Sequence, residues 1–123
     1  MRVRLTKTFP QNHIEMPGTD EAYLAWVRTQ PSCISGQYSE YVNGEGLNPA
    51  CHVRRSSTFG TGFKALFSAI PMTHQEHHHQ TVAGEAACLA LFLPDFAVWD
   101  KQTAKEWFDD KVLEYRQKWM ESL

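Results

Sequence analysis

The chain has 123 residues, of which 42% are hydrophobic and 12% aromatic, and a formal net charge of −2. This balance excludes a chain kept disordered by its charge, and the length fits one domain, residues 1–123, around one core. The longest apolar run, residues 86–93, is far shorter than the roughly 20 residues that span a bilayer. The first nine residues interleave charged and apolar side chains, unlike a secretory signal. We therefore expect a cytoplasmic protein without membrane contact.

The three cysteines are Cys33, Cys51 and Cys88, and none forms a C-x-x-C pair. An odd count without such a pair argues against a disulfide framework and against a four-cysteine zinc site. We expect packed thiols and no structural zinc.

The charge is unevenly distributed along the chain. Between Glu45 and Glu76 there is no acidic residue, whereas Arg54, Arg55 and Lys64 lie within this window. Three cations make a thin patch, but a window without acids would attract a polyanion.

In the N-terminal part, residues 3–9 alternate apolar with polar side chains, which predicts a half-buried strand. Thr19 then precedes two acids and can cap a helix that ends before Pro31. The spacing i, i+3, i+4 gives this helix a buried aromatic face of Tyr23, Trp26 and Val27. Residues 33–49, rich in Gly, Ser and Asn, predict turns with one short strand.

The central part predicts two strands, residues 50–54 and 65–72, joined by a flexible glycine-containing loop at 56–63. Thr73 and Glu76 then form a T-x-x-E capping box, so the histidine cluster at 74–79 occupies the first turns of a helix that Gly84 ends.

The C-terminal part predicts an apolar helix at residues 85–92 that ends before Pro94. A second capping box, Thr103 with Glu106, predicts a last helix at about 104–122. Its apolar stripe, at i, i+4, i+7 and i+11, consists of Phe108, Val112, Tyr115 and Trp119.

Four histidines fall in the predicted helix. Three and four residues beyond His74 lie His77 and His78, which share its face, whereas His79 points elsewhere. Imidazoles one helical turn apart can hold a divalent cation. His52 lies on a strand that could pair with the strand running into this helix, and it could supply a further reactive group.

Five stretches in this order resemble the small phage and prophage HNH, or His-Me finger, nucleases related to the RecA-dependent nucleases. The stretches are YLAWVRTQPSCISG (23–36), ACHVRR (50–55), GTGFK (60–64), IPMTHQEHHHQTVAGE (70–85) and EWFDDKVLEY (106–115). The resemblance implies an α+β fold: a single small domain with a ββα-metal core at about residues 50–84, flanked by N- and C-terminal helices.

The resemblance also implies a function. The implied protein is a metal-dependent endonuclease that hydrolyses phosphodiester bonds of DNA and leaves a 5′-phosphate and a 3′-hydroxyl. It would act in phage or prophage DNA recombination or processing. The partners would be DNA and, as a further option, a recombinase filament. The implied roles are general base for His52, ligands of Mg²⁺, Mn²⁺ or Zn²⁺ for His77, His74 and His78, and DNA phosphate contacts for Arg54, Arg55 and Lys64.

Two positions depart from the pattern. Thr81 stands where the family has a histidine, and Gly36 stands where relatives with a structural zinc have a second cysteine. The first departure keeps an alternative open, in which the protein is a catalytically weak or inactive relative that acts as a metal-stabilised DNA- or protein-binding module. His52 and His74 would then be packing residues, and Arg54 and Arg55 part of a solvated strand end.

Overall fold

The computed structural model describes residues 16–57, 60–63, 66–94 and 98–123, without the side chains of residues 55–57 and 60–63. The strand expected at residues 3–9 and the predicted phosphate contact Lys64 lie outside these ranges. Within them the fold is α+β, and its strands pair two by two in antiparallel sheets. No helix in the described part of the chain is long and apolar enough to cross a membrane.

Helix α1 (Asp20–Arg28) begins where its capping residue predicts. Thr19 Oγ1 accepts a hydrogen bond from the Ala22 N–H at 3.1 Å, and Tyr23 and Val27 are fully buried. The predicted face is therefore confirmed for Tyr23 and Val27, whereas Trp26 is half-buried and packs against the core. The helix ends three residues before Pro31.

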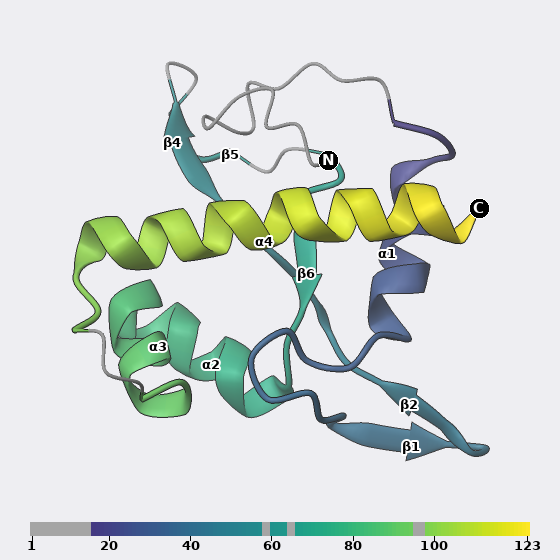
Figure 1. The fold of residues 1–123 in the computed structure, drawn as a ribbon, viewed down its shortest axis with the longest axis horizontal. Coiled ribbons are helices and arrows are strands. Elements are labelled where there is room, and N and C mark those ends of the chain that lie inside the picture. The colour runs from purple at the N-terminus through teal and green to yellow at the C-terminus, as the bar shows by residue number, and fades with distance from the viewer. Residues whose placement is uncertain (1–15, 58–59, 64–65, 95–97) are drawn as a thin grey trace.

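The centre of the fold is an antiparallel pair of strands followed by a helix (Figure 1). Strand β3 (Ala50–His52) pairs with β6 (Ala69–Pro71), and His52 lies opposite Ala69. Helix α2 (His74–Ala83) follows β6 after two residues. The predicted pairing is confirmed, although both strands are shorter than the sequence indicated.

Two hairpins extend from this centre. Strands β1 (Glu40–Val42) and β2 (Glu45–Leu47) are joined by Asn43 and Gly44. Both linking residues have positive φ, 53° and 83°, as a tight Asn-Gly hairpin turn requires. Strands β4 (Arg55–Ser57) and β5 (Gly60–Phe63) also pair, so the prediction of an irregular loop here was wrong. Pairing satisfies backbone groups that a loop would leave to water.

The last two helices are α3 (Glu85–Phe92) and α4 (Lys101–Ser122). Gly84, at φ 97°, separates α2 from α3 as predicted. The predicted start of α4 was wrong, because its capping box is formed by Asp100 and Thr103. The Asp100 carboxylate accepts from the Thr103 N–H at 2.8 Å, and the Thr103 hydroxyl accepts from the Asp100 N–H at 3.0 Å.

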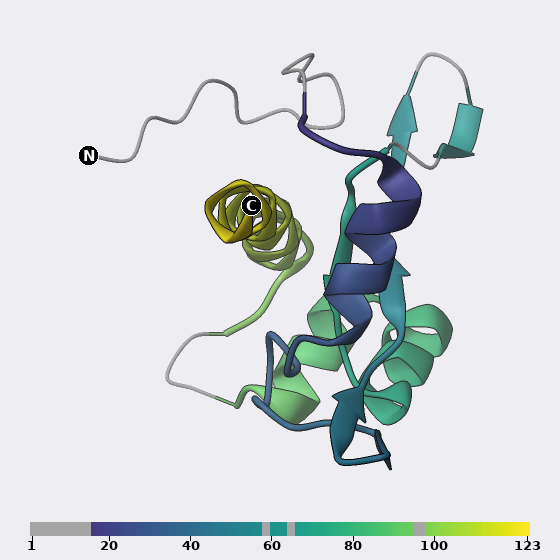
Figure 2. The same cartoon turned by 90° about the vertical axis from the view of Figure 1, so that its right-hand side faces the viewer.

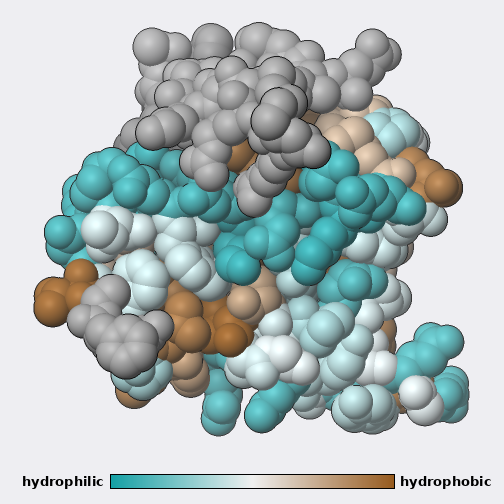
Figure 3. All heavy atoms as spheres, viewed as in Figure 1, coloured by the Kyte–Doolittle hydropathy of each residue, from teal (hydrophilic) through white to brown (hydrophobic). Residues whose placement is uncertain are grey.

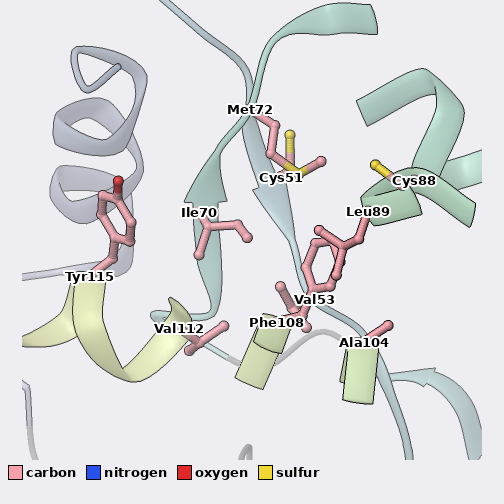
Figure 4. Packing of buried hydrophobic residues seen from close by; sticks show 10 residues of the cluster. All are labelled: Cys51, Val53, Ile70, Met72, Cys88, Leu89, Ala104, Phe108, Val112 and Tyr115. Atoms are coloured by element: carbon pink, nitrogen blue, oxygen red, sulfur yellow. The ribbon is translucent and has the colours of Figure 1, made fainter. Parts of the chain in front are cut away.

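The predicted stripe of α4 is confirmed as part of the core. Phe108 and Val112 pack with Cys51, Ile70 and Met72 (Figure 4). Figure 2, which looks along α4, shows this helix on one side of the β3–β6 pair and α2 on the other. The outward face of α4 is hydrophilic (Figure 3), and the helix is therefore amphipathic.

Substitution of the two candidate capping residues of α4 should have unequal effects. The Thr103 N–H and hydroxyl lower the pKa of Asp100, so its contribution to stability is present at neutral pH and fades as the pH falls below about 4. Asp100→Ala should therefore lower the melting temperature at pH 7 and have less effect in acid. Glu106→Ala, in the first turns of the same helix, should have little effect at either pH. Calorimetry measures both melting temperatures, and equal decreases in the two variants would contradict the assignment of Asp100 as the N-cap of α4.

Candidate functional site at the histidine helix

The start of α2 is held by the predicted capping box. Thr73 Oγ1 accepts from the Glu76 N–H at 3.2 Å, and Glu76 Oε1 accepts from the Thr73 N–H at 2.8 Å. Because the box defines the first turn, it also determines which way each histidine of α2 points.

Glu76 has a second, buried partner. Its carboxylate is 2% exposed, and Oε1 also accepts from the Ser32 hydroxyl at 2.6 Å. Ser32 Oγ in turn accepts from the backbone N–H groups of Ile34 and Ser35. The loop after α1 is thereby attached to the histidine helix. The sequence predicted only the capping role of Glu76, because a partner 44 residues away leaves no local signal.

The histidines of α2 have different surroundings. His74 and His78 are exposed, and His77 and His79 are half-buried. The ring of His79 lies edge-on to Phe92 of α3, with 5.7 Å between the centroids. Its Nδ1 is buried and has no hydrogen-bond partner among the described residues. His79 therefore points away from the face that His74 and His78 share, as the helical period predicted.

Two of the predicted ligands have an oxygen beside one ring nitrogen. Nδ1 of His77 lies 3.2 Å from Oε1 of Gln80, one turn further along α2. Nε2 of His74 lies 3.3 Å from Oε1 of Glu40, on the β1–β2 hairpin. The Gln80 contact could have been found from its i, i+3 spacing. The Glu40 contact could not, because it depends on where the hairpin lies.

His52 occupies the last position of β3. Its neighbours Cys51 and Val53 are each 2% exposed and belong to the core. Alternation along the strand directs the half-buried His52 to the other face, as expected. Arg54 is exposed, and Arg55 begins β4.

The described residues contain no group of three or more His, Cys, Asp or Glu side chains close enough to hold a metal ion. The joint binding of a cation by His77, His74 and His78 therefore stays a prediction. The donors have a suitable chemistry, since imidazole nitrogens bind divalent transition metals, and a carboxylate, that of Glu40, lies beside His74.

The three cysteines all lie in the described part of the chain, and none forms a disulfide. Cys51 and Cys88 belong to the core (Figure 4). The half-buried Cys33 packs against it. Burial raises the pKa of Cys51 and of Cys88 to about 12 and also raises that of Cys33. These groups are protonated thiols at neutral pH, as expected for packing residues.

No protein-family model, curated protein or solved structure matches the chain.

Removal of the Ser32 hydroxyl should destabilise the protein. Ser32→Ala removes one of the two hydrogen bonds to the buried Glu76 carboxylate and the acceptor of two backbone N–H groups, and a cost of about 1–3 kcal/mol is expected. Ser35→Ala, three residues further along the same loop and exposed, should change the free energy of unfolding by less than about 0.5 kcal/mol. Urea unfolding of both variants measures the difference, and equal values would contradict the role of Ser32.

Alkylation should report the state of the thiols. Because the raised pKa values leave little thiolate at pH 8, iodoacetamide should modify the folded protein far more slowly than the urea-unfolded chain. Mass spectrometry over time gives both rates. A cysteine that reacts as fast in the folded protein as in the unfolded chain would show that its thiol is as accessible and as readily ionised as in the unfolded chain.

Proposed function

We propose that the protein is a metal-dependent DNA endonuclease of the HNH, or His-Me finger, type. The supporting observation is the pairing of β3, which carries His52, with β6, which runs into the histidine helix α2. A strand–strand–helix unit with a histidine on the first strand and further histidines on the helix is the arrangement that this chemistry uses.

His52 would act as the general base. A histidine ordinarily titrates near pH 6.5, so its neutral form can accept a proton from water at physiological pH. The ring stands on a strand whose adjacent side chains, Cys51 and Val53, are anchored in the core. This anchoring would limit its motion relative to the substrate phosphate.

The cation would be held by His77 together with His74 and His78. When bound, it would stabilise negative charge on the scissile phosphate and the leaving oxygen. Two or three imidazoles leave positions for water and for phosphate oxygens. Imidazole donors suit Zn²⁺ better than Mg²⁺ or Mn²⁺, which prefer oxygen ligands.

DNA would be the substrate. Arg54 is exposed and lies two residues beyond His52. The sequence contains no acidic residue between Glu45 and Glu76, so the segments on either side of His52 carry no negative side chain that would repel a phosphate backbone. Arg54, with Arg55 and Lys64, would contact backbone phosphates without reading base sequence. The products would be a 5′-phosphate and a 3′-hydroxyl, in phage or prophage DNA recombination or processing, with a recombinase filament as a candidate partner.

A second candidate function is a metal-stabilised DNA- or protein-binding module without activity. Thr81, in place of a helix histidine, favours it because one potential metal ligand for catalysis is missing.

Cleavage assays separate the two functions. Single-stranded, duplex and branched DNA are each incubated with Mg²⁺, Mn²⁺ or Zn²⁺ and the purified chain. We expect a chelator to abolish cleavage and His52→Ala to slow it by about 10²–10⁴-fold. His77→Ala should also reduce the cleavage rate, and it should raise the metal concentration that is needed for half-maximal cleavage. Gln75→Ala, at an exposed position between His74 and His77 in sequence, is the matched control and should retain wild-type rates.

The outcomes lead to different conclusions. If wild type binds DNA but cuts none of these substrates with any metal, the binding module is the better account. Full activity in His52→Ala with unchanged folding would remove the general-base assignment.

A further inference from the structure

Each of two predicted ligand histidines already has one ring nitrogen beside an oxygen. The distances are 3.2 Å from His77 Nδ1 to Gln80 Oε1 and 3.3 Å from His74 Nε2 to Glu40 Oε1. A neutral imidazole carries one N–H and one lone pair, and only the lone pair can bind a metal ion. The location of the proton therefore decides which atom of each histidine can be a ligand.

The two oxygens decide where the proton is. An amide oxygen and a carboxylate only accept hydrogen bonds. The oxygen of Gln80 favours a proton on Nδ1 of neutral His77, which leaves the lone pair on Nε2. The carboxylate of Glu40 lies at ion-pair distance from Nε2 of His74 and favours the proton on that nitrogen, which leaves the lone pair on Nδ1.

We propose that Gln80 and Glu40 are positioning residues that set the tautomers of His77 and His74. The available metal-binding atoms are then Nε2 of His77 and Nδ1 of His74. What these lone pairs bind rests on the proposed function, whereas the tautomers themselves do not.

Both oxygens are held in place by the fold. Gln80 lies one turn beyond His77 on the same helix and is half-buried, as His77 is. Glu40 directly follows Ser39, whose hydroxyl accepts from the backbone N–H of His74 at 2.8 Å. The β1–β2 hairpin is thus attached to the first residue of α2 at two points.

The hairpin is in turn anchored by a buried amide. Asn48 is 3% exposed, and its Oδ1 accepts from both the N–H and the hydroxyl of Ser39. Its Nδ2 donates to the carbonyl oxygens of Gln30 and Gln37. These hydrogen bonds hold the backbone next to Glu40 in place, although the Glu40 side chain itself is 54% exposed. Partners of this kind orient ligand histidines, and their loss lowers metal affinity about 10–100-fold.

The tautomers can be observed without metal or DNA. ¹⁵N NMR of the imidazoles at about pH 9, above the ordinary histidine pKa, should show His77 protonated on Nδ1. Imidazole in water prefers the proton on Nε2, so Gln80→Ala should return His77 to that form. Gln75→Ala, a glutamine change on the same helix, should leave it unchanged. A wild-type His77 protonated on Nε2, or no response to Gln80→Ala, would overturn the assignment.

Metal affinity tests the positioning roles directly. Co²⁺ binding to the full chain, followed by calorimetry and the visible d–d spectrum, should weaken about 10–100-fold in Gln80→Ala and in Glu40→Ala. Gln80→Glu keeps an acceptor oxygen and should restore binding. The controls Gln75→Ala and Glu45→Ala, the latter on strand β2, should match wild type.

Affinities in Gln80→Ala and Glu40→Ala equal to wild type would overturn the positioning roles. If the tautomers respond as expected but wild type binds no Co²⁺, the tautomer assignment stands and the metal-dependent function fails.

Discussion

The antiparallel pairing of β3 with β6 is the contact on which the rest of the arrangement depends. It joins two short segments separated by the β4–β5 hairpin, and it directs Cys51 and Ile70 into the core against α4. Because side chains alternate along a strand, burial of Cys51 and Val53 sends His52 to the opposite face. The same ladder ends at Pro71, two residues before the capping residue of α2, so it sets where the histidine helix begins.

A chain of polar contacts then places α2 relative to the N-terminal half. Ser32 reaches the buried Glu76, Ser39 reaches the backbone of His74, and Asn48 holds Ser39. A buried carboxylate without partners would be costly, so this geometry is strongly constrained. The histidine face is consequently bordered by the β1–β2 hairpin, and Glu40 and Gln80 become part of the proposed site.

Prediction succeeded where the determinant is local. The caps at Thr19 and Thr73, the break at Gly84 and the stripe on α4 all follow from side chains within a few residues of each other. The start of α4 was placed one turn late because Thr103 fits two capping boxes. It can be the N-cap of a box with Glu106, as predicted, or the N3 residue of a box whose N-cap is Asp100, as the structure has it. The β4–β5 pairing was missed because short polar strands with glycine carry little periodic signal.

The sequence by itself determined the helices, the buried faces and the types of donor available, since these depend on propensity, capping and spacing along one segment. It also determined the face of α2 on which His74 and His78 lie. The i, i+3 spacing also places Gln80 beside His77, whereas only the tertiary structure decided that Glu40 stands beside the ring of His74. Glu40 is 34 positions from His74 in sequence, and they meet because Ser39, Asn48 and Glu76 fix the hairpin and the loop against α2. Contacts of this length leave no periodic trace, so the oxygen beside the His74 ring follows from packing alone.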